Sequence, residues 1–217
     1  MIIVGICGGS GKSTFAERIR DGLSCSCEIM RLDCYYFDQG GKPFEERTKV
    51  NYDSPEIFDF DEMLEDIRLL LDGKPVTRKG YNYAEHRRDD SEELMYPPEV
   101  LIIEGIHVFY DDRICDVMNL KLFIKVDSDI YLLRRIARDM NERGRSLESI
   151  SEQYKATVKP MREKYIDKYI DKADVVVMRG GMNEQALKTT ISYLKSCVKE
   201  QRPAESEKNE SDGNDSE

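Results

Sequence analysis

The chain has 217 residues, of which 40% are apolar and 35% are charged, with 43 acidic residues against 33 basic ones. This length suits one α/β domain with a small insertion better than two full domains. The net charge of −10 argues against a nucleic-acid partner, because binding a phosphate backbone requires a dense basic surface. No segment approaches the roughly 18 consecutive apolar residues of a membrane span, so we expect no membrane partner.

Two features of the sequence predict a cytoplasmic protein. The apolar segment at residues 2–7 lacks a basic flank and continues into a glycine-rich stretch, so it does not resemble a secretion signal. The six cysteines are scattered along the chain, which is typical of reduced thiols.

Strand-like and helix-like patterns alternate, which predicts an α/β fold with a five-stranded parallel sheet between two helical layers. Short apolar segments predict strands at residues 2–7, 27–32, 100–103, 120–126 and 173–178. Amphipathic patterns predict helices at residues 12–22, 55–72, 128–140, 147–170 and 183–198. In the second of these helices Asp53 and Ser54 are N-cap candidates. Its predicted buried face contains Phe60, Met63, Leu64, Ile67 and Leu71.

Residues 75–97 interrupt this alternation. They combine a Tyr-Asn-Tyr alternation at 81–83 with a charged stretch at 85–93, which predicts a small two-stranded hairpin with a polar tip. The sequence after residue 201 is acidic and has no large apolar side chains, so we expect a disordered tail. We therefore predict one domain at residues 1–200, with the hairpin at about 75–97, and a tail at 201–217.

A glycine-rich turn joins the first predicted strand to the first predicted helix, at Gly8, Gly9, Ser10, Gly11, Lys12, Ser13 and Thr14. This order is typical of a P-loop, whose successive backbone N–H groups bind phosphate oxygens at a helix N-terminus. Lys12 is predicted to contact the β- and γ-phosphates, and the Ser13 hydroxyl to bind Mg²⁺. The loop is short, because the usual Gly-x-x-x-x-Gly-Lys spacing would place a glycine where Ile6 stands. A glycine-rich turn without a ligand is the alternative.

Two acidic residues stand at predicted strand ends. Asp33 follows the second strand, at the sheet edge where open α/β folds bind ligands, although a turn-closing aspartate is the alternative. Glu104 ends the third strand of the chain and is predicted to bind Mg²⁺ through water, or else to pair with Lys12. His107 has no predicted chemistry beyond that of a hydrogen-bonded residue in a turn.

Five arginines lie within twelve residues of this acidic chain: Arg134, Arg135, Arg138, Arg143 and Arg145. Gly144 interrupts the helical pattern there, which predicts a mobile lid at about 141–148. Such a lid neutralises charge on a transferring phosphate and excludes water. The alternative is an ordinary charged helix face paired with neighbouring acidic residues.

Further motifs follow in a specific order: Asp-Cys-Tyr-Tyr at 33–36, Asn-Tyr-Asp-Ser-Pro-Glu-Ile-Phe-Asp at 51–59, Tyr-Asn-Tyr-Ala-Glu-His at 81–86, Glu-Gly-Ile at 104–106, Arg-Arg at 134–135, Glu-Arg-Gly-Arg-Ser-Leu-Glu at 142–148, Gln-Tyr at 153–154, Val-Lys-Pro at 158–160 and Arg-Gly-Gly at 179–181. With the glycine-rich turn, they make residues 1 to about 199 resemble the uridine (uridine–cytidine) kinase family of P-loop kinases. Members of that family usually have two more residues in the P-loop, as Gly-Gly-x-x-Ser-Gly-Lys.

The resemblance implies a P-loop NTPase-like kinase that moves the γ-phosphate of ATP or GTP to the 5′-hydroxyl of uridine or cytidine, with Mg²⁺. It implies that Asp33 receives the hydroxyl proton and that Asp53 binds the ribose. The other implied nucleoside contacts are Tyr81, Tyr83, His86, Arg135, Arg145 and Gln153. Arg138 and Arg143 would contact the phosphates, Arg179 would line the adenine side, and the family's homo-oligomeric assembly is also implied.

The residues alone leave other interpretations open. Asp53 is also a suitable N-cap residue for a helix. The tyrosines of the hairpin can pack on the protein core as readily as on the base of a nucleoside. The family more often has Asp and Phe where Asn82 and Tyr83 stand. A nucleotide-binding module without catalysis is a second function, and a related P-loop kinase that acts on another hydroxylated metabolite is a third.

Overall fold

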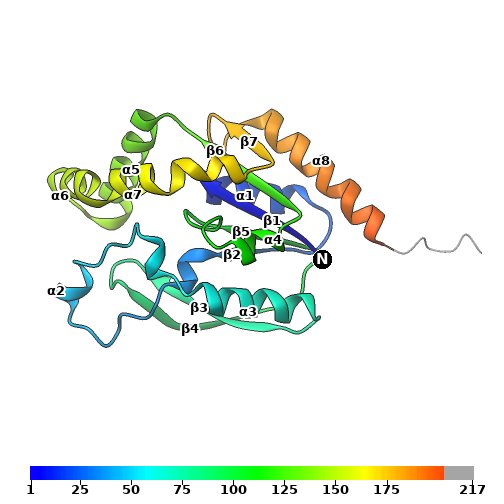
Figure 1. Cartoon of the computed structure of the whole chain (residues 1–217), viewed down its shortest axis with the longest axis horizontal. Helices are drawn as coiled ribbons and strands as arrows, with labels where there is room; N and C mark the ends of the chain where they lie inside the picture. Colours follow the sequence, from blue (N-terminus) through cyan, green and yellow to red (C-terminus); the bar gives the residue numbers. More distant parts are fainter. Residues whose placement is uncertain (203–217) are drawn as a thin grey trace, which may run out of the picture.

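The computed structural model describes residues 1–202, and its centre is a five-stranded sheet (Figure 1). The strands are β1 (Ile2–Gly8), β2 (Cys27–Arg31), β5 (Val100–Glu104), β6 (Leu120–Lys125) and β7 (Val175–Met178). They pair in parallel in the order β2-β5-β1-β6-β7. The predicted parallel sheet is confirmed, and β1, which is buried along its whole length, is its central strand.

Helices cover both faces of the sheet, so the predicted three-layer arrangement is also confirmed. On one face, α1 (Lys12–Gly22) and α8 (Glu184–Gln201) enclose a core that contains Phe15, Ile19 and Leu194. On the other face, α3 (Phe60–Leu71) and α4 (Asp112–Asp116) enclose a second core. Within residues 1–202, no helix combines the length and the apolar character needed to cross a membrane.

The predicted start of α3 is wrong. Residues Pro55–Ile57 form a separate 3₁₀ turn, and the helix begins at Phe60, where Asp59 accepts a hydrogen bond from the amide of Glu62. Phe58 between them is extended, because it forms an antiparallel bridge with Tyr36. Asp53 and Ser54 therefore do not cap this helix.

The predicted buried face of α3 is wrong at one position. Leu71 is 47% exposed, whereas Leu70 is buried. A helix that starts at Phe60 buries residues three or four positions apart, and Leu70 follows Met63 and Ile67 in that series.

The excursion from the main sheet is a hairpin of β3 (Val76–Asn82) and β4 (Arg87–Met95). Val76 and Met95, a cross-strand pair at its base, are buried in the core beside α3. A register irregularity lies between Lys79 and Tyr81, and the tip at 83–86 ends with His86 in a left-handed conformation, at φ 51°. The tip thereby reaches beyond the core, towards the carboxyl ends of the main strands.

Several helical segments follow β6. They are α5 (Ser128–Arg143), α6 (Leu147–Gln153), a π-helical turn (Tyr154–Val158), α7 (Lys159–Lys164) and a 3₁₀ segment (Ile166–Lys172). The single helix predicted at 147–170 is therefore wrong: Pro160 has no N–H to donate at the start of α7, and the chain leaves the helix at Tyr165. Gly144, at φ 62°, ends α5 where the hinge was predicted. A short helix, α2 (Phe44–Arg47), lies in the segment after β2. Of the tail predicted at 201–217, Gln201 belongs to the last helix, Glu184–Gln201, and residues 203–217 are outside the described residues.

Candidate active site

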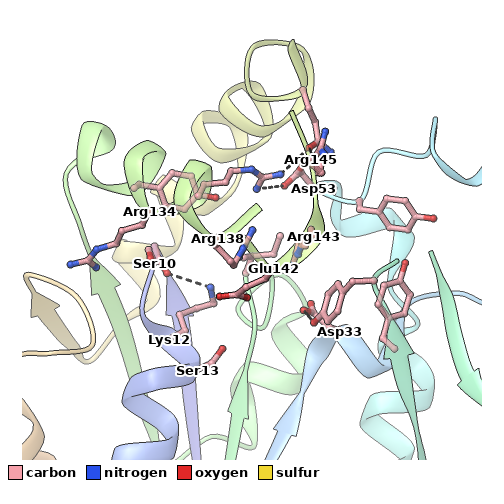
Figure 2. Close-up of a pocket in the computed structure, with 18 of the residues that line it drawn as sticks. Ser10, Lys12, Ser13, Asp33, Asp53, Arg134, Arg138, Glu142, Arg143 and Arg145 are labelled. Carbon is pink, nitrogen blue, oxygen red and sulfur yellow. Dashed lines mark hydrogen bonds and ion pairs between the residues drawn. The ribbon is translucent and has the colours of Figure 1, made fainter. Parts of the chain in front are cut away.

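A large cavity lies at the carboxyl ends of the sheet strands and has a volume of about 1060 Å³. Its lining comes from the β1–α1 turn, the segment after β2, the hairpin tip and the helices α5 and α6. Figure 2 shows Lys12 and Ser13 on one side, Asp33 on the other, and Arg138 and Arg143 between them. Parallel strands open towards one edge, which explains why segments so distant in the sequence meet there.

The β1–α1 turn presents a row of free backbone donors. The amides from Ser10 to Thr14 have no hydrogen-bond acceptor within residues 1–202, while the amide of Gly9 donates to the carbonyl of Ile124 at 2.7 Å. Gly8 and Gly11 have φ values of 102° and 100°, which let the chain curl there. Ile6 lies in β1 and is fully buried in the core, so it does not occupy the turn. The shortened loop therefore offers five successive amides to an anion.

The β1–α1 turn packs against Gly180 and Gly181 through Gly11. A Cβ on Gly11 would lie 2.6 Å from the amide nitrogen of Gly181, and a Cβ on Gly181 would collide with the carbonyl oxygen of Gly11. Lys12 Nζ donates to the carbonyl of Gly9 at 3.3 Å, which folds this side chain over the turn. Among the residues predicted to contact the phosphate donor, Gly8 and Arg179 do not line the cavity.

The two predicted Mg²⁺ ligands contact one another, since the Ser13 hydroxyl donates to Glu104 at 2.9 Å. Burial raises the pKa of Glu104, and its ion pair is with Arg31 at 3.7 Å rather than with Lys12. A hydroxyl and a carboxylate are hard oxygen donors that suit Mg²⁺. In the described part of the chain no cluster of three acidic, His or Cys residues could hold a metal alone, so the ion would also need phosphate oxygens and water.

Asp33 lies in a 3₁₀ turn, Leu32–Tyr35, directly after β2. Its carboxylate faces the cavity and accepts a hydrogen bond from the hydroxyl of Tyr83 at 2.5 Å. Tyr83 also carries the guanidinium of Arg143 over its ring, at 4.6 Å from the centroid. The sequence predicts Tyr83 as a nucleoside contact, and nothing in the pattern indicates that it reaches Asp33.

Asp53 is almost buried and lies on the opposite wall from the P-loop turn. Its carboxylate accepts a hydrogen bond from Thr157 at 3.3 Å and lies 3.8 Å from Arg135. Burial raises the pKa of Asp53. Its carbonyl accepts from Nε2 of His107 at 2.8 Å, and the Nδ1 of that ring lies 2.9 Å from the Tyr169 hydroxyl.

His107 is a residue that the sequence analysis left without a role. Its ring is fully buried, and this burial lowers its pKa to about 4. The imidazole is therefore neutral near pH 7, with Nε2 donating to Asp53 and Nδ1 accepting from Tyr169. No sequence signal distinguishes this position, because its partners lie more than 50 residues away.

The cavity also has an aromatic wall, formed by Tyr36, Tyr52, Tyr81 and His86. The rings of Tyr52 and His86 stack at 5.1 Å, and those of Tyr36 and Tyr81 lie 4.6 Å apart. Burial, followed by the charges of nearby arginines, lowers the pKa of His86. The wall can therefore offer a flat apolar surface beside a neutral imidazole. Tyr36 and Tyr52 were not predicted, although both stand in the motifs that contain Asp33 and Asp53.

Four of the predicted arginines, named here the lid arginines, surround one buried carboxylate, that of Asp139. The N–O distances from Asp139 are 2.8 Å to Arg138, 3.5 Å to Arg135, 3.5 Å to Arg143 and 3.8 Å to Arg145.

Gln153 joins this cluster by accepting hydrogen bonds from Arg135, at 3.1 Å, and from Arg145. Arg134 also lines the cavity. The alternative of a charged helix face is right in that the arginines pair with a neighbouring acidic residue, Asp139, but this carboxylate is fully buried and is not part of an ordinary exposed face.

A parallel sheet with a glycine-rich turn after its central strand defines the class of P-loop phosphotransferases when acidic and basic residues surround that turn. Here the acidic residues are at the ends of β2 and β5, and the arginines lie on α5. A model of the phosphoribulokinase / uridine kinase family matches residues 2–186, and the chain belongs to this family. A uridine kinase from Ligilactobacillus salivarius is 41% identical over 201 residues, which cover 91% of this chain and 94% of that protein. A uridine kinase from Streptococcus uberis is 43% identical over 202 residues, which cover 92% and 96%.

Solved structures agree on the fold. Phosphoribulokinase from Rhodobacter spheroides superposes with a TM-score of 0.60 at 13% identity, covering 82% of this chain and 69% of that one. D-glycerate 3-kinase from Cryptococcus neoformans superposes with a TM-score of 0.51 at 13% identity, covering 84% and 87%. At these identities the likeness concerns the fold alone.

Proposed function

We propose that the protein transfers the γ-phosphate of ATP, or of GTP, to the 5′-hydroxyl of uridine or cytidine and forms UMP or CMP. The observation that carries the proposal is the placement of five free P-loop amides and the Asp33 carboxylate on opposite sides of one cavity. The uridine kinase relatives, at 41% and 43% identity over most of the chain, support a pyrimidine nucleoside as the acceptor.

The donor phosphates would lie against the amides from Ser10 to Thr14, with Lys12 turning from the Gly9 carbonyl to the phosphates. Asp33 would hold the acceptor hydroxyl in line with the γ-phosphorus and take its proton as the new O–P bond forms. The bond from the γ-phosphorus to the β–γ bridging oxygen would break in the same step, and ADP or GDP would leave. In a loose transition state the attacking oxygen needs little activation, so its position matters more than the basicity of Asp33.

The nucleoside would lie between the aromatic wall and α5. Aromatic rings stack on a planar base, and the neutral ring of His86 can hydrogen-bond to its polar edge. Asp53 would accept hydrogen bonds from the ribose hydroxyls, with its charge offset by Arg135. Arg145 and Gln153, which already share a hydrogen bond, lie on the same side of the cavity.

Arg138 and Arg143 lie between the P-loop turn and Asp33 in Figure 2, where the transferring phosphate would be. Two guanidinium groups there would offset the charge that spreads over the phosphate oxygens in the transition state. Because both lie on α5 and pair with Asp139, a movement of this helix about Gly144, which follows Arg143, would carry them together and would exclude water on closing.

The proposal includes Mg²⁺, which Ser13 and Glu104 would hold together with phosphate oxygens and water. The ion would supply positive charge that offsets the charge of the donor phosphates. We also propose the cytoplasm as the location, which the six free cysteines support, and the homo-oligomeric assembly that the family resemblance implies.

The test is a coupled assay of ADP release with uridine and with cytidine, at saturating ATP and Mg²⁺. We expect turnover by the wild type, none by Lys12→Ala, and loss of transfer in Asp33→Asn with ATP binding retained in calorimetry. Turnover equal to that of Lys12→Ala would reject the proposal.

The same experiments separate the two alternatives. A binding module would take up ATP or uridine in calorimetry and transfer nothing to any acceptor. A kinase for another metabolite would release ADP with a different hydroxylated acceptor and not with uridine or cytidine. An Asp33→Asn variant that retained activity would remove the role assigned to Asp33.

A further inference from the structure

Tyr83 contacts two residues of the site that are far apart in the sequence, Asp33 and Arg143. Its hydroxyl lies 2.5 Å from Oδ2 of Asp33, and the guanidinium of Arg143 lies over its ring. One side chain therefore contacts both the carboxylate that would take the acceptor proton and an arginine beside the lid hinge. The family resemblance places a phenylalanine more often at this position, and phenylalanine lacks the hydroxyl.

We propose that Tyr83 is a positioning residue for phosphoryl transfer, whose hydroxyl fixes one oxygen of Asp33 so that the other oxygen faces the acceptor hydroxyl. This inference rests on the proposed function, because it takes Asp33 as the group that receives the proton.

The hydrogen bond from Tyr83 is the one contact that orients the Asp33 carboxylate. Within residues 1–202, no other donor or cation lies within hydrogen-bond or ion-pair distance of it. Without this donor, the carboxylate could rotate about its Cβ–Cγ bond and present either oxygen in several directions. A fixed carboxylate keeps the acceptor oxygen close to the line of attack, where small displacements cost large factors in rate.

The direction of the hydrogen bond follows from the chemistry of the two groups. Burial and the charge of Asp33 both raise the pKa of Tyr83, so the phenol stays protonated and donates. The ionised carboxylate has lone pairs on both oxygens, and accepting at Oδ2 leaves Oδ1 free for the acceptor.

The hairpin tip holds the Tyr83 ring in place. The side chain of Asn82 accepts hydrogen bonds from the amides of Ala84 and Glu85, both at 3.0 Å, which fixes the turn after Tyr83. Tyr81 packs edge-on against the Tyr83 ring at 5.2 Å, and Arg143 lies over that ring. The hydroxyl is thus oriented by a supported ring, although Tyr83 is 42% exposed.

The discriminating variant is Tyr83→Phe, which keeps the ring and the contact with Arg143 and removes only the hydroxyl. We expect kcat with uridine to fall about 10- to 100-fold, which corresponds to the loss of one hydrogen bond to a charged group, while the KM for ATP changes less than 2-fold.

The split between kcat and the KM for ATP separates positioning from a merely structural role, since a displaced hairpin tip would also change substrate binding. Tyr83→Leu, which also removes the ring beneath Arg143, should lower kcat further and raise the KM for ATP. Tyr96→Phe is the matched control, since Tyr96 is 66% exposed and lies outside the cavity, and it should leave kcat and the KM for ATP unchanged.

A Tyr83→Phe enzyme with the wild-type kcat would overturn the proposal, and so would one whose KM for ATP rises as much as its kcat falls. An increase in kcat would overturn it as well, because it would mean that the hydroxyl keeps Asp33 away from the acceptor. Failure of the proposed function would look different, since the wild type itself would then show no turnover with uridine or cytidine.

Discussion

Asp139 is a fully buried carboxylate that holds the lid arginines together. Mutual repulsion would spread four guanidinium groups apart, and one central negative charge offsets it. The proposed function assigns Arg138 and Arg143 to the phosphates and Arg135 and Arg145 to the nucleoside, so the same carboxylate would fix both groups of arginines. Removing a buried partner of this kind is costly, since the remaining charges lose their compensation.

We therefore expect Asp139→Asn, which keeps the size of the side chain and removes its charge, to lower kcat/KM for both substrates at least 10-fold. The free energy of unfolding should fall by about 1 to 3 kcal/mol, less than for a fully desolvated pair because three of the arginines are partly exposed. Steady-state kinetics and urea unfolding measure the two effects.

Asp171→Asn is the control for charge, since Asp171 is exposed and lies outside the cavity. It should leave both quantities within error. Wild-type kinetics in Asp139→Asn would mean that the arginines position themselves without the carboxylate.

At the residue scale, the sequence showed which types of side chain form the site better than it showed which of these side chains contact one another. The arginines were predicted from their density, but the role of Asp139 was not, because spacing along a helix does not reveal which face turns inward. Asp33 was predicted from its place after a strand. Its contact with Tyr83 was not, because it depends on how far the hairpin tip reaches over the sheet.

At the scale of elements, the shortened P-loop turn depends on a second glycine turn from a distant part of the chain. Gly180 and Gly181 pack directly on Gly11, so the space behind the amides is filled by backbone instead of by further loop residues. This close approach is available only to residues without a side chain.

Gly181→Ala tests that dependence, because the new methyl group would collide with the carbonyl of Gly11 and displace the turn. We expect the KM for ATP to rise at least 5-fold while the KM for uridine changes less than 2-fold. Gly41→Ala is the matched control: a Cβ there meets nothing within 4 Å, so the same substitution should leave both constants unchanged. Equal effects of the two substitutions would contradict the role given to the 180–181 turn.

The elements themselves were predicted well wherever burial alone determines them. All five sheet strands are short apolar segments, and each was located to within about two residues of its observed bounds. The start of α3 was missed because the pairing of Phe58 with Tyr36 joins segments more than 20 residues apart. The helix predicted at 147–170 was broken by local geometry near Pro160 and Tyr165 that its apolar periodicity does not reveal.

At the scale of the whole molecule, His107 joins three segments that meet beneath the site. The ring follows β5 and hydrogen-bonds both to the loop before α3, through the carbonyl of Asp53, and to the 3₁₀ segment after α7, through Tyr169. Protonation would place a second donor opposite the Tyr169 hydroxyl and a charge in a fully buried position. The fold therefore requires the neutral ring, which agrees with the lowered pKa of about 4.

This requirement predicts a pH dependence of stability with a definite sign. The pKa of His107 is about 4 in the folded protein and near 6.5 in an unfolded chain, so between these values only the unfolded state binds the proton. The contribution of His107 to the free energy of unfolding is thus fully present above pH 6.5 and falls as the pH is lowered to about 4. The largest loss is about 3 kcal/mol, from 1.36 kcal/mol per pKa unit.

Urea unfolding of the wild type and of His107→Gln at pH 7, 6, 5 and 4.5 measures this contribution as a difference. The raised pKa values of Asp53 and Glu104 act in the opposite direction. The contribution of Glu104 cancels because this residue is present in both proteins and is not hydrogen-bonded to His107. Repeating the comparison in an Asp53→Asn background removes the contribution of Asp53, whose carbonyl accepts a hydrogen bond from the ring. We expect the stability advantage of the wild type to shrink steadily below pH 6.5. Parallel curves for the two proteins would show that the His107 ring is accessible to protons in the folded state and that its hydrogen bonds to Asp53 and Tyr169 do not depend on its neutral form.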